Sequence, residues 1–132
     1  MLDEFPVPAT DAEWDKFIEA WIASWPIDDR SEDVAWAADA ISDWSLEEDK
    51  HETLWEFITR AFEKKMPERT FAVLAAGPLE DLLSEFGHLY IDRVEELARK
   101  NPRFNELLGG VWRLSMTDNV WERVQKARLK VW

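Results

Sequence analysis

Between residues 14 and 25, apolar side chains recur at the spacing of one face of an α-helix. These side chains are Trp14, Phe17, Ile18, Trp21, Ile22 and Trp25. They share one face because an α-helix has about 3.6 residues per turn. Thr10 and Glu13 have the spacing of a capping box, in which each side chain bonds the backbone N–H of the other residue. The sequence therefore predicts a helix from this box to Pro26, which cannot continue it.

The same period runs through the rest of the chain. It predicts helices over 31–44, 45–66, 68–76, 78–86, 90–98 and 102–108, and a last helix that begins at Thr117. Ser31 is the expected N-cap of the first of these, and Ser45 and Glu48 form a second capping-box pattern that opens the longest helix. Gly87 is expected to end the 78–86 helix, and Asn101 and Thr117 are expected to cap the 102–108 helix and the last helix. No Asn-Gly or Asp-Gly hairpin signal occurs in the sequence.

The predicted fold class is therefore all-α. We expect a single domain over 1–132 of about seven to eight mostly short helices, with residues 1–9 as an extended N-terminal segment. Frequent Gly and Pro breaks favour either an irregular bundle or stacked antiparallel helix pairs.

Gly77, Pro78, Glu80 and Asp81 form a predicted structural corner. Gly77 is a natural helix stop, and Pro78 suits the first position of the next helix. Glu80 and Asp81 would then lie in a first turn, where carboxylates favour the helix dipole and cap free N–H groups. A buried hydrogen-bonding role or a binding role is the alternative for these two carboxylates.

Charge restricts the partners that this chain can have. Its 132 residues hold 28 Asp and Glu against 16 Lys and Arg, a net charge of -12. Residues 1–66 hold 18 acidic and 6 basic side chains, whereas residues 67–132 hold 10 of each. Such a field repels nucleic-acid phosphates and anionic lipids and attracts basic proteins. We therefore expect a basic protein partner and no direct binding to nucleic acid or to a membrane.

The sequence also bears on the compartment. The longest apolar stretch, 71–79, is far shorter than the ~20 residues that span a bilayer. The first residues carry acids where a secretory signal carries Lys or Arg. The chain has no cysteine, which fits a reducing compartment. The expected location is the bacterial cytoplasm.

Two Glu-x-x-His pairs are the only hints of metal chemistry. Glu48 with His51, and Glu85 with His88, have the spacing that di-iron helical bundles use. Such a site needs further inward-facing carboxylates, and the sequence offers only carboxylates that we expect to be solvated. Gly87 also interrupts the second pair. We predict no catalytic residue, no metal site and no cofactor.

Nine tryptophans stand out, and most should be core residues, because one indole buries on the order of 200 Å². Several acidic residues could form an anionic ridge along the second and third helices. They are Asp39, Asp43, Glu47, Asp49, Glu52 and Glu56. Beside this ridge, Trp36 or Trp44 could anchor a partner. The predicted partner-binding residues are Trp36, Asp39, Asp43, Trp44 and Glu47. The alternative is a ridge that only confers solubility.

A run of motifs in the second half resembles a family of small bacterial domains of unknown function. The motifs are 74–83 (LAAGPLEDLL), 91–95 (IDRVE), 101–104 (NPRF), 109–112 (GGVW) and 116–124 (MTDNVWERV). The family usually has His before Gly, whereas this chain has Gly87 before His88, so no role is carried over to the histidine. The resemblance implies a soluble bacterial domain and no particular activity. It also implies that Glu80 and Asp81 have a role beyond solubility.

These observations favour a non-enzymatic, acidic protein-binding module. An immunity or antitoxin-like inhibitor of a basic partner, such as a nuclease, is the leading hypothesis. A nucleic-acid mimic and a helical adaptor or homo-oligomer are the alternatives of the binding class. A metal-dependent enzyme that uses Glu48 and His51 is the alternative of the catalytic class. The oligomeric state is left open by the sequence.

Overall fold

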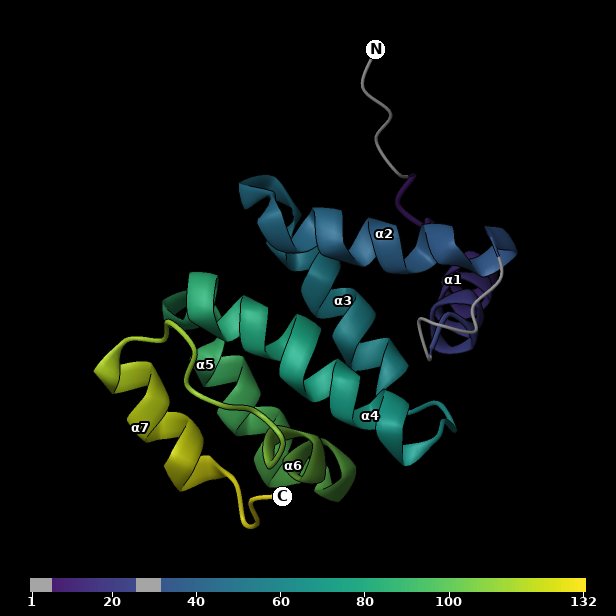
Figure 1. The fold of residues 1–132 in the computed structure, drawn as a ribbon. Coiled ribbons are helices and arrows are strands. Elements are labelled where there is room, and N and C mark those ends of the chain that lie inside the picture. Colours follow the sequence, from purple (N-terminus) through teal and green to yellow (C-terminus); the bar gives the residue numbers. More distant parts are fainter. Residues whose placement is uncertain (1–5, 26–31) are drawn as a thin grey trace. The chain divides into compact units, whose positions relative to one another are not determined.

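The regular secondary structure is helical throughout the part of the chain that the computed structural model describes, residues 6–25 and 32–132 (Figure 1). The helices are α1 (Asp11–Ala23), α2 (Glu32–Leu46), α3 (His51–Ala61), α4 (Glu68–Leu74), α5 (Glu80–Lys100), α6 (Pro102–Leu108) and α7 (Asp118–Ala127). A short 3-10 turn (Glu48–Lys50) precedes α3, and a π-helical turn (Ala75–Leu79) joins α4 to α5. These residues contain no β-strand, and the predicted all-α class is confirmed.

The chain divides into two compact units, Met1–Ala61 and Phe62–Trp132. In unit 1, helices α1, α2 and α3 pack against one another. In unit 2, α6 and α7 pack against α5, and the π-helical turn contacts both α4 and α5. The single-domain assignment stays a prediction.

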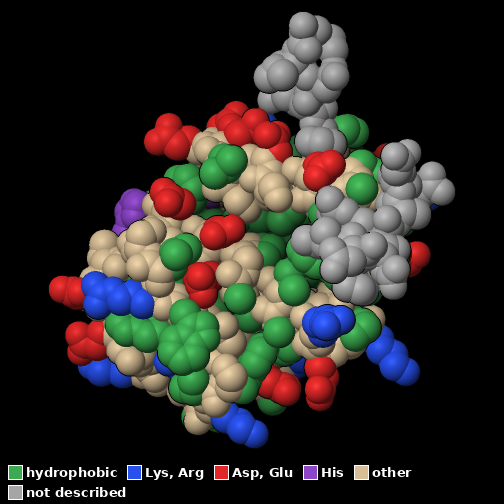
Figure 2. Space-filling view, in the orientation of Figure 1, with side chains coloured by type: hydrophobic (Ala, Val, Ile, Leu, Met, Phe, Trp, Pro, Cys, Tyr) green, Lys and Arg blue, Asp and Glu red, His purple; other side chains and the backbone are tan. Residues whose placement is uncertain are grey.

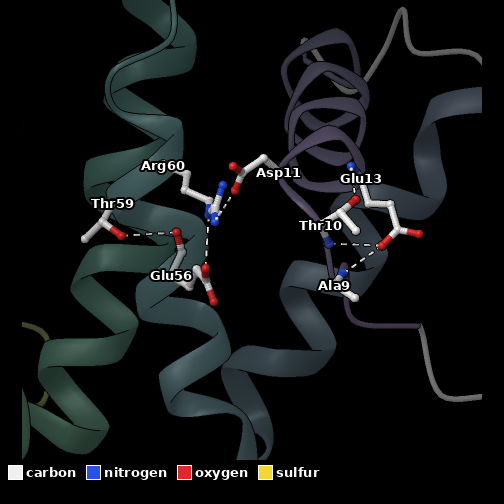
Figure 3. A network of polar contacts seen from close by, with 7 residues as sticks. All are labelled: Ala9, Thr10, Asp11, Glu13, Glu56, Thr59 and Arg60. Carbon is white, nitrogen blue, oxygen red and sulfur yellow. Dashed lines mark hydrogen bonds and ion pairs between the residues drawn. The ribbon is translucent and has the colours of Figure 1, made fainter.

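Helix α1 begins as its capping box predicts. The Oγ1 atom of Thr10 accepts a hydrogen bond from the backbone N–H of Glu13, and Oε1 of Glu13 accepts one from the backbone N–H of Thr10, each at 3.1 Å (Figure 3). The helix ends at Ala23, where the hydroxyl of Ser24 donates to the carbonyl of Trp21 at 2.6 Å. The predicted stop at Pro26 and the predicted cap at Ser31 lie outside the described residues.

Aromatic rings form the core of unit 1. Phe17 lies among four of them, stacked on Trp44 at 5.1 Å between ring centroids and edge-on to Trp14, Trp36 and Phe57. Trp14, Trp21 and Trp44 are buried, as the helical spacing of the tryptophans predicts. Such edge-to-face and stacked pairs hold the rings in fixed orientations.

The predicted capping box at Ser45 is wrong. Helix α2 continues to Leu46, and the hydroxyl of Ser45 donates to the carbonyl of Ile41 at 2.8 Å. A serine can bond in this way to the carbonyl one turn earlier, so it can lie inside a last turn as well as at a cap. Helix α3 consequently begins at His51 and ends at Ala61, and the longest helix is α5 instead.

The predicted helix break at Gly77 and Pro78 is wrong. The chain stays helical from α4 through the π-helical turn into α5, and Pro78 lies inside that turn. A wider turn tolerates proline, which lacks the N–H of an ordinary α-helical bond. The predicted break at Gly87 lies next to a real one. Helix α5 extends to Lys100, but the backbone of Phe86 is not helical (φ -130°, ψ 22°), and the helix kinks there.

Glycine at position 87 serves the packing of α7 on α5. A Cβ atom there would lie 2.8 Å from a methyl group of Val120, which belongs to α7. The absence of a side chain therefore lets the two helices approach closely. Asn101 and Thr117 cap α6 and α7 as predicted, since their side chains accept hydrogen bonds from backbone N–H groups of the first turn.

Candidate functional site

Helix α2 carries a line of side chains away from its buried face, of which Trp36, Asp39 and Leu46 are exposed and Asp43 is half-buried. Its buried face consists of Ala37, Ala38, Ala40, Ile41 and Trp44. The opposite face carries Trp36, Asp39, Asp43 and Leu46, which are separated by three, four and three residues. This spacing places the four side chains in one line along the helix axis. We call them the α2 stripe.

The two ends of the α2 stripe are apolar and exposed. Trp36 is 38% exposed and Leu46 is 87% exposed. The indole of Trp36 rests edge-on against Phe17 at 5.3 Å between ring centroids, so it has a fixed support in the core. A partly exposed, supported indole loses little further conformational freedom when it contacts a partner.

The middle of the α2 stripe consists of two unneutralised carboxylates. Among the described residues, neither Asp39 nor Asp43 has a hydrogen-bond or ion-pair partner. Two other carboxylates of unit 1 are paired, since Arg60 donates at 3.0 Å to both Asp11 and Glu56 (Figure 3).

Helix α2 is less stable with these carboxylates than without them. Like charges four residues apart repel each other by roughly 0.2–0.5 kcal/mol. Asp43 also lies in the last turn of α2, which holds no basic residue, and the helix dipole disfavours an anion there. Folding therefore does not explain Asp39 and Asp43. Solubility and the binding of a cation-bearing partner are the two explanations that remain.

The other predicted partner-binding residues have different surroundings. Trp44 is 1% exposed and stacks on Phe17, so it is a core residue and no anchor for a partner. The sequence next to Asp43 does not show that Trp44 is buried, because this burial results from contact with Phe17 of α1. Glu47 follows α2 and lies 3.9 Å from the ammonium group of Lys50.

The predicted anionic ridge is partly neutralised beyond the end of α2. Asp49 lies 3.6 Å from Lys50, and Glu56 bonds Arg60. The acidic side chains nonetheless gather over α2 and the turn that follows it in the space-filling view (Figure 2). The ridge is therefore least neutralised at Asp39 and Asp43, for which residues 6–25 and 32–132 provide no cation.

The charge of the chain is confined to the unit that carries the α2 stripe. Residues 1–61 contain 17 Asp and Glu against 4 Lys and Arg, an excess of 13 negative charges. Residues 62–132 contain 11 acidic and 12 basic side chains, so unit 2 is close to neutral. The electrostatic field that a distant partner meets is thus centred on unit 1.

Leu46 is the member of the stripe that the sequence interpretation missed. Its distance from Asp43, three residues, continues the spacing of the stripe, but the supposed capping box assigned it to the next helix. The apolar end at Leu46 becomes visible only once α2 is known to run through Ser45.

Glu80 at the predicted corner has a structural role. Its Oε1 atom accepts a hydrogen bond from the backbone N–H of Trp112 at 2.8 Å, which ties the loop after α6 to the start of α5. Because α5 continues from a helical turn, Glu80 and Asp81 do not occupy a free helix start, and the predicted benefit from the dipole does not apply.

Asp81 is half-buried and has no hydrogen-bond or ion-pair partner among the described residues. Burial and then the neighbouring carboxylates of Glu80 and Glu85 raise its pKa above the ordinary value. The Oγ atom of Ser84, one turn further along α5, is also buried without a partner. These groups form a small polar region on α5.

A pocket of about 480 Å³ lies in unit 2 beside the last residues of the chain. It is lined by Glu68, Phe71, Pro102, Asn105, Glu106, Leu129, Lys130 and Trp132. The amide of Asn105 is fully used within the protein, since it donates to the carbonyls of Ala98 and Ala127 and accepts from the N–H of Leu129. The buried polar group of this pocket thus holds α5, α7 and the last residues together and is not available to a ligand.

No group of three or more His, Asp or Glu side chains in residues 6–25 and 32–132 is close enough to hold a metal ion. Glu48 lies in the 3-10 turn and His51 begins α3, so this pair does not lie within one α-helix. Within the described ranges, no helix combines the length and the apolar character needed to cross a membrane.

The model of a family of unknown function, DUF6869, matches residues 26–131. The match confirms the predicted resemblance to a domain family of unknown function, and it extends further towards the N-terminus than the motifs of the second half. It includes the α2 stripe. No curated protein and no solved structure matches the chain.

Proposed function

Since the chain belongs to the DUF6869 family, a family of unknown function, we propose a function from the geometry of unit 1. The chain is a non-enzymatic protein-binding module of the bacterial cytoplasm, and the α2 stripe docks on a basic protein. The observation that carries the proposal is the pair Asp39 and Asp43, two carboxylates four residues apart on α2 that have no partner among the described residues.

Several features of the stripe support a protein as the partner. Exposed apolar side chains at Trp36 and Leu46 flank the carboxylates, and aromatic anchors beside charged groups are typical of protein interfaces. The excess of 13 negative charges in unit 1 would accelerate the encounter with a basic surface. A nucleic acid would be repelled by the same field.

A nuclease belongs to this class of partner, because an enzyme that binds polyanions presents a cationic surface. A chain that covers such a surface would act as an immunity or antitoxin-like inhibitor, and one that copies the phosphate positions would act as a nucleic-acid mimic. Both activities use the same docking face, so one capture experiment tests their common basis.

The test is affinity capture from a lysate of the native bacterium. Wild type is compared with Asp39→Lys/Asp43→Lys and with Glu19→Lys/Glu63→Lys, a control of equal net charge at exposed acids without a described partner. We expect wild type and control to retain the same basic protein, identified by mass spectrometry. The Asp39→Lys/Asp43→Lys variant should lose it, and high salt should release it. Retention by that variant, or capture of acidic proteins only, would contradict the proposal.

Inhibition is tested with the captured protein itself. If that protein is a nuclease, equimolar wild type should block its hydrolysis of DNA or RNA, and Asp39→Lys/Asp43→Lys should not. Unimpeded hydrolysis at saturating wild type would remove the immunity role and leave the docking role intact.

A further inference from the structure

We propose that the element which docks on the α2 stripe is a basic amphipathic α-helix of the partner. This helix carries two Lys or Arg side chains four residues apart, and an apolar side chain three residues beyond each of them. The inference rests on the proposed function, because it assumes that the stripe is a docking face, and it goes beyond it by specifying the shape and sequence pattern of the partner.

The spacing of the stripe carries the inference. An α-helix rises 1.5 Å per residue, so the four side chains from Trp36 to Leu46 lie at roughly 0, 4.5, 10.5 and 15 Å along the axis. A second helix that runs alongside α2 repeats this spacing with residues three, four and three apart. The pattern reads the same in both directions, so a parallel and an antiparallel partner helix fit equally well.

An extended strand does not fit the same four positions. Side chains on one face of a strand recur at a constant interval of about 6.6–6.8 Å. A strand centred on Asp39 and Asp43, which are about 6 Å apart, would place its next side chains roughly 2.5 Å beyond Trp36 and Leu46 at each end. Only a partner with the helical period meets the carboxylates and both apolar ends together.

Charge excludes a second copy of this chain as the occupant. Two α2 helices packed antiparallel around the centre of the stripe would bring Asp39 of each copy against Asp43 of the other. Two parallel copies would bring each aspartate against its own equivalent. Neither residue has a described cation nearby that could neutralise such contacts. Electrostatic repulsion therefore disfavours self-association through the stripe, whereas attraction favours a basic helix.

The apolar ends exclude a partner that offers cations alone. Trp36 is supported by Phe17, and Leu46 is almost fully exposed, so burial of both against apolar side chains adds a hydrophobic contribution at each end of the ion pairs. Cations enclosed between two apolar contacts are also less hydrated, which strengthens their attraction to Asp39 and Asp43.

Synthetic peptides test the inference on the full chain. The first is a capped helical peptide of about fifteen residues with the pattern Leu-x-x-Arg-x-x-x-Arg-x-x-Leu in an alanine and glutamine background. The second has the same composition, but its arginines lie on the helix face opposite the leucines. Fluorescence anisotropy of labelled peptides gives the two dissociation constants at physiological salt.

We expect wild type to bind the patterned peptide at least tenfold more tightly than its isomer. Asp39→Asn/Asp43→Asn should weaken binding of both peptides at least tenfold, whereas Glu19→Gln/Glu63→Gln, which removes the same charge elsewhere, should leave the preference unchanged. Trp36→Ala/Leu46→Ala should retain a salt-sensitive affinity and lose the preference for the pattern. Circular dichroism of each variant verifies that its helices are intact.

Equal affinity for the two peptides would overturn the inference, and so would the absence of binding to either. A preference that survives in Trp36→Ala/Leu46→Ala would overturn it as well. Failure here remains distinct from failure of the proposed function. Capture of a basic protein by Asp39 and Asp43, together with equal peptide affinities, retains the docking role and removes only the helical partner.

Discussion

Asp81 carries a charge that folding disfavours. Burial and the carboxylates of Glu80 and Glu85 raise its pKa, so the folded chain binds more protons than the unfolded chain between the unfolded and the folded pKa. The free energy of unfolding therefore falls as the pH rises through that window, and the full loss persists above it.

Asp81→Asn is expected to raise the free energy of unfolding at neutral pH. The gain should be about 0.5 kcal/mol, because a half-exposed carboxylate is screened by solvent. It should vanish below the unfolded pKa, where the carboxyl group is neutral in both states. Urea unfolding at the two pH values measures the difference. An equal gain at both would assign the effect to packing instead of charge.

Gly110 makes room for the last tryptophan of the chain. The indole of Trp132 stacks on Phe71 at 6.1 Å, and its backbone N–H donates to the carbonyl of Gly109. A Cβ atom on Gly110 would lie 2.5 Å from that indole and 3.0 Å from the Cβ of Ala75, which leaves no space for it.

Gly110→Ala should therefore displace Trp132 and lower the free energy of unfolding by about 1–3 kcal/mol. Fluorine NMR of the fluorotryptophan-labelled protein follows the indole, with Trp132→Phe to assign its resonance. An unshifted resonance together with unchanged stability would contradict the close packing. The sequence alone identifies Gly109 and Gly110 only as a helix stop, because nothing local to them shows that residue 132 returns to this point.

At the scale of helices, two glycines in the same helical run have opposite roles. A Cβ on Gly87 would meet Val120 of α7 at 2.8 Å, whereas a Cβ on Gly77 would meet nothing within 4 Å. Both positions lie within a helical run, with Gly87 directly after the kink at Phe86, so alanine gains at most about 1 kcal/mol of helix propensity at either. Only at Gly87 does overpacking, about 1–3 kcal/mol, outweigh that gain.

Gly77→Ala should therefore stabilise the protein and Gly87→Ala should destabilise it. Denaturant unfolding gives both values, and hydrogen exchange should show faster exchange in α7 only for Gly87→Ala, because the separation of α7 from α5 exposes it. Destabilisation by Gly77→Ala would mean that the π-helical turn requires glycine for a reason other than space.

Helix positions follow from the sequence wherever the signal is local. The capping box at Thr10 and the caps at Asn101 and Thr117 depend on side chains within one turn, and all three are confirmed. The wrong predictions at Ser45 and Pro78 concern residues that can either end a helix or lie within one. Their choice is decided by packing partners from distant parts of the chain, which a local pattern does not contain.

At the scale of the whole molecule, the candidate site is only partly visible in the sequence. The period of the carboxylates on α2 and the acidic excess of the first half can be counted directly. The sequence does not show whether Trp36 or Trp44 faces outward, since Trp44 is buried by stacking on Phe17 of α1. Trp36 makes a separate, edge-on contact with the same ring and stays partly exposed.

The uneven charge predicts opposite effects of salt on stability and on binding. Unit 1 has 17 acidic against 4 basic side chains, so its charges repel one another across the folded structure. The screening length falls from about 30 Å at 0.01 M salt to about 8 Å at 0.15 M, which removes most of this repulsion. The same change weakens the attraction of the α2 stripe for a basic partner.

We therefore expect the melting temperature to rise by roughly 3 °C over this range of sodium chloride, equivalent to about 1 kcal/mol, while the affinity for the patterned peptide decreases. Differential scanning calorimetry gives the first value and fluorescence anisotropy the second. A neutral osmolyte at equal osmolality should leave both almost unchanged, and Asp39→Asn/Asp43→Asn should reduce the salt dependence of both. A melting temperature that falls with salt would mean that ion pairs such as Arg60 with Asp11 outweigh the repulsion. Asp39 and Asp43 would then not lower the stability of the fold, and their presence would no longer favour a binding role.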